Sequence, residues 1–133
     1  MKKITTEETL ELVKKLKEIA NSINDYQIKN FDILSTKEFM TLNKAEFDIL
    51  SRVQDLLAKS VVVEVENSAE LLSKMTTITQ NIKDVLGTID KINRVISITT
   101  STVFLVSALI SKNPTAIAGA ISSLKEELNK NKK

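Results

Sequence analysis

The sequence predicts an all-α protein, an elongated bundle of four helices in up-down order with one long helix and a C-terminal helical hairpin. Two observations lead to this prediction. The 133 residues include only two glycines and one proline, and this favours helices because both residue types weaken helix interiors. Apolar residues also recur at steps of three and four, which places them on one helix face. A chain of this length is expected to form a single domain, residues 1–133.

The first helix is predicted over about residues 5–33. Thr5 and Glu8 have the spacing of a capping box, in which the two side chains each accept a hydrogen bond from a backbone N–H group of the first turn. Ser35 and Glu38 repeat this pattern, so a second helix is expected to begin at residue 36. The apolar stripe of the first helix is Leu12, Leu16, Ile19, Ile23 and Tyr26.

The second helix is predicted over about residues 36–60. The segment after it, Val61 to Val65, is rich in valine, which favours strands. A lone strand would have no partner in this chain, so we expect a helix end or a tight corner. An edge strand that pairs with another chain is the alternative. The apolar residues of the second helix are Phe39, Leu42, Phe47, Ile49, Leu50, Val53, Leu56 and Leu57.

A heptad repeat predicts one long third helix over about residues 68–112. Its apolar positions alternate at steps of four and three, which is the pattern of a coiled-coil seam. At about 1.5 Å per residue the helix would be a rod of about 60 Å. The positions are Leu71, Met75, Ile78, Ile82, Val85, Ile89, Ile92, Ile96, Thr99, Val103, Val106 and Ile110.

A fourth helix is predicted over about residues 114–131. Asn113 is suited to cap it and Pro114 to occupy its first position. Beside its apolar stripe runs a strip of small residues, which we expect to allow close packing on the end of the third helix. The stripe is Ile117, Ile121, Leu124 and Leu128, and the strip is Ala116, Gly119, Ala120 and Ser123.

The composition argues against catalysis. The chain has no histidine and no cysteine, so it lacks the usual general base, the usual metal ligands and any thiolate nucleophile. We therefore predict no enzymatic activity, no cofactor, no metal site and no small-molecule substrate. A net charge of +2 and only two arginines, Arg52 and Arg94, also make a nucleic-acid partner unexpected.

The segment from Val95 to Ser111 contains 17 uncharged residues, and from Val103 onward it is apolar nearly all round the helix. Such a helix must be covered. Three covers remain open: the bundle itself, another protein or a second copy, and lipid. Seven of the 17 residues are serine or threonine, and a membrane span needs about 20 mainly apolar residues.

The expected function is that of a non-enzymatic helical interaction protein, acting through coiled-coil and apolar surfaces by self-association or with a dedicated protein partner. The alternative is a membrane-active component, such as a subunit of an α-helical pore-forming system, that uses the hairpin 95–121. The interface residues expected for the first are Ile89, Ile92, Ile96, Val103, Val106 and Ile110; the hairpin residues expected to contact a membrane or partner are Phe104, Leu105, Leu109, Ile117 and Ile121.

A third hypothesis, a small inhibitor or immunity protein that binds one cognate target, has no distinguishing sequence signature. The N-terminal lysines are not followed by an apolar segment of the kind that a secretory signal contains. The default location is therefore the cytoplasm, and leaderless export or membrane association stays open.

Overall fold

The computed structural model describes residues 2–58, 63–65, 67–88, 91–111 and 113–129. Within these residues the chain forms five α-helices and one pair of short β-strands. The all-α prediction is confirmed. The helices are α1 (Thr6–Lys29), α2 (Thr36–Leu57), α3 (Ser68–Thr88), α4 (Ile92–Ile110) and α5 (Pro114–Asn129), and the strands are β1 (Lys2–Lys3) and β2 (Glu64–Val65).

The predicted helix starts at the two capping boxes are confirmed. The Thr5 Oγ1 atom accepts from the Glu8 backbone at 3.1 Å, and the Glu8 carboxylate accepts from the Thr5 backbone at 2.8 Å. Ser35 and Glu38 make the same pair of bonds at 3.1 and 2.9 Å. The predicted end of the first helix at residue 33 is wrong, because α1 ends at Lys29. The predicted ends at 60 and 131 lie outside the described residues.

The single long helix over 68–112 is wrong: α3 ends at Thr88 and α4 begins at Ile92. Lys91 has an extended backbone (φ −93°, ψ 109°), and its carbonyl accepts from the Arg94 N–H group at 3.0 Å to start the new helix. A heptad repeat shows only which positions are apolar. The same spacing of apolar positions can continue across a turn that separates two helices. Folding back lets α4 bury apolar area that a rod would leave in water.

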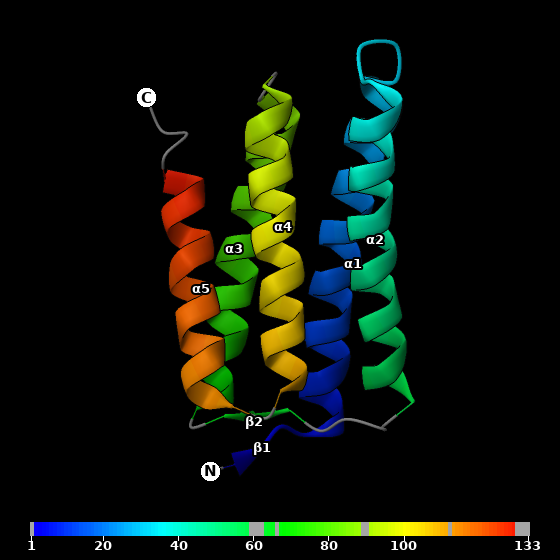
Figure 1. The fold of residues 1–133 in the computed structure, drawn as a ribbon. Coiled ribbons are helices and arrows are strands. Elements are labelled where there is room, and N and C mark those ends of the chain that lie inside the picture. The colour runs from blue at the N-terminus through cyan, green and yellow to red at the C-terminus, as the bar shows by residue number, and fades with distance from the viewer. Residues whose placement is uncertain (1, 59–62, 66, 89–90, 112, 130–133) are drawn as a thin grey trace.

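The five helices alternate in direction and form two layers (Figure 1). Helices α5, α4 and α2 lie in one layer, and α3 and α1 lie behind them. The packed pairs close a ring in the order α1, α2, α4, α5, α3 and back to α1. As a result α2 and α4 are parallel neighbours, and so are α3 and α5.

The two strands cover one end of the bundle (Figure 1). They are antiparallel, with Lys2 paired to Val65, and the Ile4 N–H group donates to the Val63 carbonyl at 3.0 Å. Ile4, Val63 and Val65 are buried. The expectation that this valine-rich segment has no strand partner within the chain is wrong, since the N-terminus supplies one. Val61 and Val62 lie outside the described residues.

Most of the apolar surface of α4 is covered by the bundle itself. Val95, Leu105 and Val106 are fully buried. The hydroxyl groups do not prevent this, because Thr102 Oγ1 donates to the Ile98 carbonyl of the preceding turn at 2.9 Å, which leaves no buried donor unpaired there. The hydroxyl-rich composition of α4 is thus compatible with a core helix.

Gly119, one of the small residues of α5, does not allow a close approach between helices. It is exposed, and a Cβ atom added there would meet no neighbouring atom within 4 Å. The expectation that this position permits tight packing on the third helix is therefore wrong.

Candidate interaction surfaces

Four large apolar side chains are exposed where α1 turns into α2. We call this group the apolar tip. It combines the last turn of α1, the connection and the second turn of α2. Soluble proteins tend to keep contiguous apolar surface small unless it has a binding role. The members are Ile28, Phe31, Ile33 and Met40, with exposed fractions of 67%, 64%, 69% and 64%.

The backbone beneath the apolar tip is well supported by hydrogen bonds. The Ile33 N–H group donates to the Asn30 carbonyl at 3.0 Å. Gln27 is buried, and its Nε2 atom donates to the Phe39 carbonyl at 3.2 Å, which ties α1 to α2. The Phe31 ring meets the Phe39 ring edge to face, with centroids 5.6 Å apart. The tip is thus a fixed turn that presents apolar side chains to solvent.

The charges around the apolar tip balance. Lys29, Asp32, Lys37 and Glu38 are the charged residues of the last turn of α1, the connection and the first turn of α2. Two are basic and two acidic, so this end of the hairpin has no basic excess of the kind that anionic lipid headgroups attract.

A second exposed surface lies on the outer side of α2 and α4. Phe47 on α2 and Phe104 on α4 are 68% and 67% exposed. A shallow groove of about 310 Å³ runs between these two helices, and Ala45 and Val103 are among the residues that line it. We call this surface the α2–α4 face. The groove is also lined by Lys44 and Asp48, which form an ion pair at 3.1 Å, and Phe47 is not among its lining residues.

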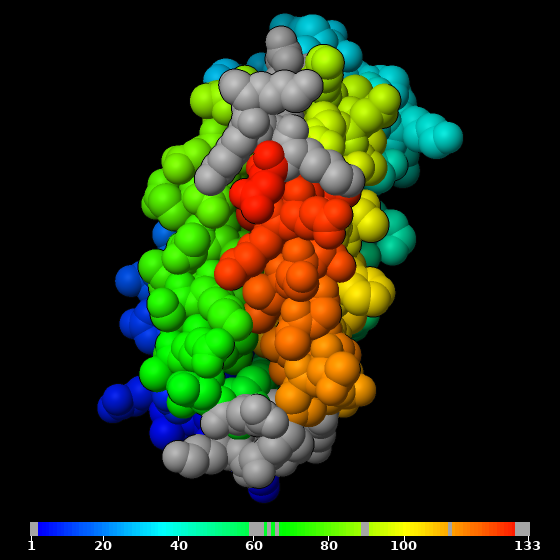
Figure 2. All heavy atoms as spheres, turned by 90° about the vertical axis from the view of Figure 1, so that its left-hand side faces the viewer, coloured from blue at the N-terminus to red at the C-terminus, as the bar shows by residue number. Residues whose placement is uncertain are grey.

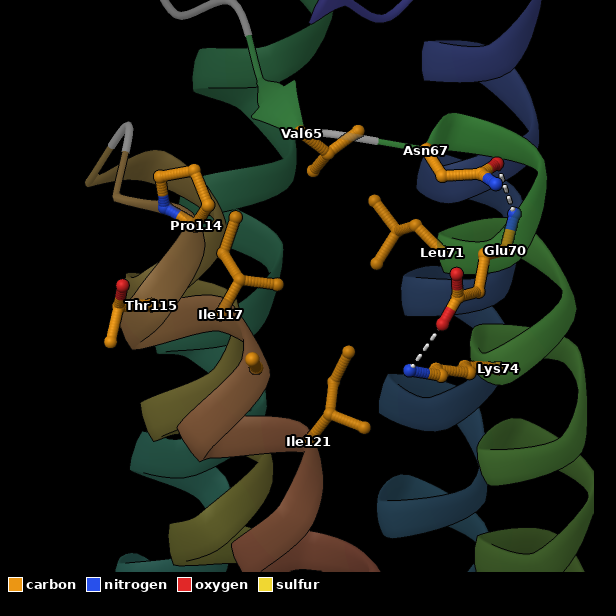
Figure 3. A pocket seen from close by; sticks show the side chains of 10 residues that line it. Val65, Asn67, Glu70, Leu71, Lys74, Pro114, Thr115, Ile117 and Ile121 are labelled. Carbon is orange, nitrogen blue, oxygen red and sulfur yellow. Dashed lines mark hydrogen bonds and ion pairs between the residues drawn. The ribbon is translucent and has the colours of Figure 1, made fainter. Parts of the chain in front are cut away.

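A third surface feature is a groove of about 590 Å³ between α3 and α5. Figure 2 shows this side of the molecule, and Figure 3 shows the lining residues. Leu71 from α3 faces Ile117 and Ile121 from α5, and the ion pair of Glu70 with Lys74 (2.9 Å) stands at the side. The lining is mixed, with apolar side chains facing one another and Asn67, Glu70, Lys74 and Thr115 at the sides.

The two helix N-termini beside this groove are occupied by their own caps. Asn67 Oδ1 accepts from the Glu70 N–H group at 3.0 Å. Asn113 Oδ1 accepts from the Thr115 N–H group at 3.0 Å and from the Ala116 N–H group at 3.2 Å. This confirms the predicted start of the last helix, and it leaves these N–H groups unavailable to an anion.

The predicted interface residues lie almost entirely on α4. Ile89 lies outside the described residues, and Val106 is fully buried. The others, Ile92, Ile96, Val103 and Ile110, are half-buried. Of the residues predicted for the hairpin, Phe104 is exposed, whereas Leu105, Leu109, Ile117 and Ile121 are buried. Whether either set binds a partner or lipid stays a prediction.

The apolar tip was not among the predicted sites, and Phe47 was listed only as one of the apolar residues of the second helix. For Phe47 a signal was available. The core positions of α2 include Leu42 and Ile49, and Phe47 is five residues from one and two from the other, which puts it on another face. For Phe31 the spacing gave no such signal, because Phe31 is four residues after the buried Gln27; its exposure follows from the end of α1 at Lys29.

Three of the described carboxyl groups have shifted pKa values. Burial raises the pKa of Glu46. The hydrogen bonds of Ser68 and of the Thr5 backbone lower the pKa of Glu8, and the ammonium group of Lys74 lowers that of Glu70. Among the described residues, no three His, Cys, Asp or Glu side chains are grouped so that they could hold a metal ion.

Of the described helices, α4 is the one long and apolar enough to cross a membrane, with a mean hydropathy of 1.4. Of its most apolar window, 44% is buried within the bundle.

No protein-family model matches the chain, and comparisons with curated proteins and with solved structures find no similar protein.

Proposed function

We propose that this protein is a non-enzymatic binding protein whose apolar tip docks onto a partner protein. The observation that carries the proposal is the exposure of Ile28, Phe31, Ile33 and Met40 on a hydrogen-bonded turn. A rigid turn loses little conformational entropy on binding, and buried aromatic and aliphatic anchors supply much of the affinity of protein interfaces.

The chemistry of the tip favours a protein over a membrane. Peripheral binding to anionic lipid draws on clusters of lysine and arginine. Here Lys29 and Lys37 are offset by Asp32 and Glu38. A protein groove with an apolar floor and a mixed polar rim matches such a surface better.

The test compares the wild-type chain with the double variant Phe31→Ser, Ile33→Ser. Leu10→Ser is the matched control, because Leu10 is also exposed (53%) but lies near the opposite end of α1. Proteins retained by immobilised wild type and by the control, but lost by the tip variant, would be purified and titrated by calorimetry. Binding that buries the tip should show a negative heat-capacity change.

Equal binding of the purified partner by the tip variant would overturn the proposal. So would the absence of any protein that the wild type retains.

The second candidate is a membrane-active component that uses the hairpin 95–121, and the length and composition of α4 favour it. Because Leu105 and Ile117 are buried, the hairpin would have to leave the bundle. The test is flotation with vesicles of mixed anionic and neutral lipid, with dye release, at neutral and mildly acidic pH. Phe104→Asp should reduce lipid binding, since Phe104 is exposed. Failure to float at either pH would rule this candidate out.

A further inference from the structure

Helix α2 carries a second stripe with heptad spacing on the side that faces solvent. Met40, Phe47 and Leu50 are 64%, 68% and 37% exposed, and Asn43 and Gln54 are also exposed. These five residues follow one another at steps of three, four, three and four, so they lie along one side of the helix. We call them the outer seam. The residues that α2 buries in the bundle form a different stripe, Leu42, Ala45, Ile49, Val53 and Leu56.

The outer seam continues the apolar tip, because Met40 belongs to both. Among the described residues eight large apolar side chains are exposed, and six of them belong to the tip or the seam. Leu10 and Phe104 are the other two. Helix α2 packs mainly against α1 and α4, which leaves this side of it uncovered at the edge of its layer (Figure 1). The exposed apolar surface is thus concentrated along one ridge.

The geometry of the outer seam fits a helix that lies along α2. From Met40 to Gln54 the seam extends for about 21 Å at about 1.5 Å per residue. A second helix with heptad spacing can pack its own apolar residues between those of the seam over this whole distance. A strand presents every second residue on one side, which does not match steps of three and four. The spacing therefore favours a helical partner, which anchors through residues three, four and seven positions apart.

Two amide side chains interrupt the outer seam. Asn43 and Gln54 occupy positions of the kind that Met40, Phe47 and Leu50 fill with apolar groups. A polar residue in such a seam costs stability, but it fixes the register of the opposite helix, because the amide needs a polar group facing it. We therefore expect the partner helix to carry polar residues opposite the two amides and apolar residues opposite Phe47 and Leu50.

The charges beside the outer seam indicate the charge of the partner helix. On one flank Lys44 pairs with Asp48 at 3.1 Å, so this flank is already neutralised. The other flank holds Glu46, which is half-buried. Burial raises the pKa of Glu46, and within the part of the chain that the structure describes no hydrogen bond or ion pair involves its carboxylate. A nearby cation stabilises such a carboxylate, so a lysine or arginine of the partner fits beside it.

A second copy of this chain does not supply that cation. In an antiparallel pair of α2 helices the flank of Glu46 faces the same flank of the other copy, which consists of Phe39, Glu46 and Val53. In a parallel pair in register, Glu46 meets the residue five positions further on, which is Ser51. Neither arrangement pairs Glu46 with a positive charge, so a different chain matches the seam better.

We propose that the outer seam of α2 binds one amphipathic α-helix of a partner protein, which lies along α2 and carries a lysine or arginine beside Glu46. The inference rests on the proposed function, because the seam extends the apolar tip and describes the partner that docks there.

The first experiment measures the binding of three fluorescent peptides, each of three heptads, to the chain by fluorescence anisotropy. One peptide has leucine at a and d and lysine at e and g. The second has glutamate in place of lysine, and the third has the composition of the first with its leucine spacing shuffled. The lysine peptide should bind at least about tenfold more tightly than the other two. The chain has a net charge of +2, so non-specific attraction would instead favour the glutamate peptide.

Variants of the chain then locate the binding site. Phe47→Ser, Leu50→Ser should raise the dissociation constant of the lysine peptide by at least about tenfold, whereas the matched control Phe104→Ser, also at an exposed phenylalanine, should change it by less than about twofold. Glu46→Lys should reverse the preference between the lysine and glutamate peptides. Glu126→Lys, at an exposed position of α5, changes the net charge equally and should not. Circular dichroism verifies the fold of each variant.

The second experiment tests whether the bound peptide is a helix. A free peptide of three heptads is only marginally helical in water. The far-ultraviolet circular dichroism of the chain mixed with the lysine peptide should therefore show more helix than the sum of the two separate spectra. A spectrum equal to that sum at saturation would overturn the inference.

The binding results can also overturn the inference. No binding of the lysine peptide up to about 0.5 mM would do so, and so would equal binding of the shuffled peptide. A dissociation constant unchanged by Phe47→Ser, Leu50→Ser, or a charge preference unchanged by Glu46→Lys, would have the same consequence.

The purified partner separates this inference from the proposed function. A partner that is lost by the tip variant Phe31→Ser, Ile33→Ser but is bound normally by Phe47→Ser, Leu50→Ser would overturn the inference and leave the proposed function standing. A partner with the opposite behaviour would overturn the proposed role of the tip and support the seam.

Discussion

Two adjacent residues on α4 should respond very differently to truncation. Leu105 is fully buried, whereas Phe104 is 67% exposed. Leu105→Ala removes atoms from the core that α4 shares with its neighbours, and Phe104→Ala removes a larger side chain that already faces water. A helix rotated by one residue would exchange these environments, so the pair tests how α4 is oriented in the bundle.

The expected magnitudes follow from this burial. A fully buried leucine costs about 2 to 5 kcal/mol when truncated to alanine. Complete burial of a phenylalanine stabilises by about 1.5 to 3 kcal/mol, so the remaining third of Phe104 contributes about 0.5 to 1 kcal/mol. For a chain of this size, each kcal/mol lowers Tm by about 3 to 4 °C. Leu105→Ala should therefore lower Tm by about 10 °C, and Phe104→Ala by about 2 to 4 °C.

The assay is urea unfolding followed by far-ultraviolet circular dichroism, with a thermal scan beside it. The protein concentration is low and the same for both variants, because any self-association would add to the apparent stability. Equal losses for the two variants, or a larger loss for Phe104→Ala, would refute the orientation of α4 and the reasoning built on its exposed face.

Three further predictions concern stability. Gly119→Ala should raise the unfolding free energy by about 0.5 to 1 kcal/mol, since the added Cβ meets nothing within 4 Å; a lower Tm would contradict it. Arg94→Ala should cost about 1 to 2 kcal/mol in urea unfolding, because Arg94 Nη2 donates to the Glu127 carbonyl at 3.0 Å, and an unchanged midpoint would contradict this. The pKa of Glu8 is lowered from 4.5 by hydrogen bonds that include Ser68, so its contribution is present above pH 4.5 and is lost as pH falls through the folded pKa. Ser68→Ala should reduce this acid-dependent loss, and an identical pH profile would argue against the bond.

The sequence predicted local features well where one short segment contains the whole interaction. The capping box of Thr5 with Glu8 involves atoms three residues apart, and both of its hydrogen bonds are present in the structure. Asn113 and Pro114 likewise mark the start of α5. These signals need no knowledge of the rest of the fold, because a helix end satisfies its N–H groups from its own neighbours.

The candidate surfaces were predicted less well. Val106 belongs to a regular heptad, yet it is fully buried in the bundle. Phe47 and Phe104 are equally apolar and are exposed. Periodicity shows which residues share a helix face, but it does not show which neighbouring helix covers that face. Phe31 is exposed for a related reason, since α1 ends at Lys29 and the connection follows.

The sequence by itself determined that the chain is helical, where most helices begin, and that the chemistry of histidine and cysteine is absent. The tertiary structure decided where the heptad segment divides, between Thr88 and Ile92. It also decided that the N-terminus pairs with Val65. Both outcomes depend on contacts between segments far apart in the chain. The apolar area gained by folding α4 back, and the backbone hydrogen bonds gained between β1 and β2, exist only once the whole bundle has assembled.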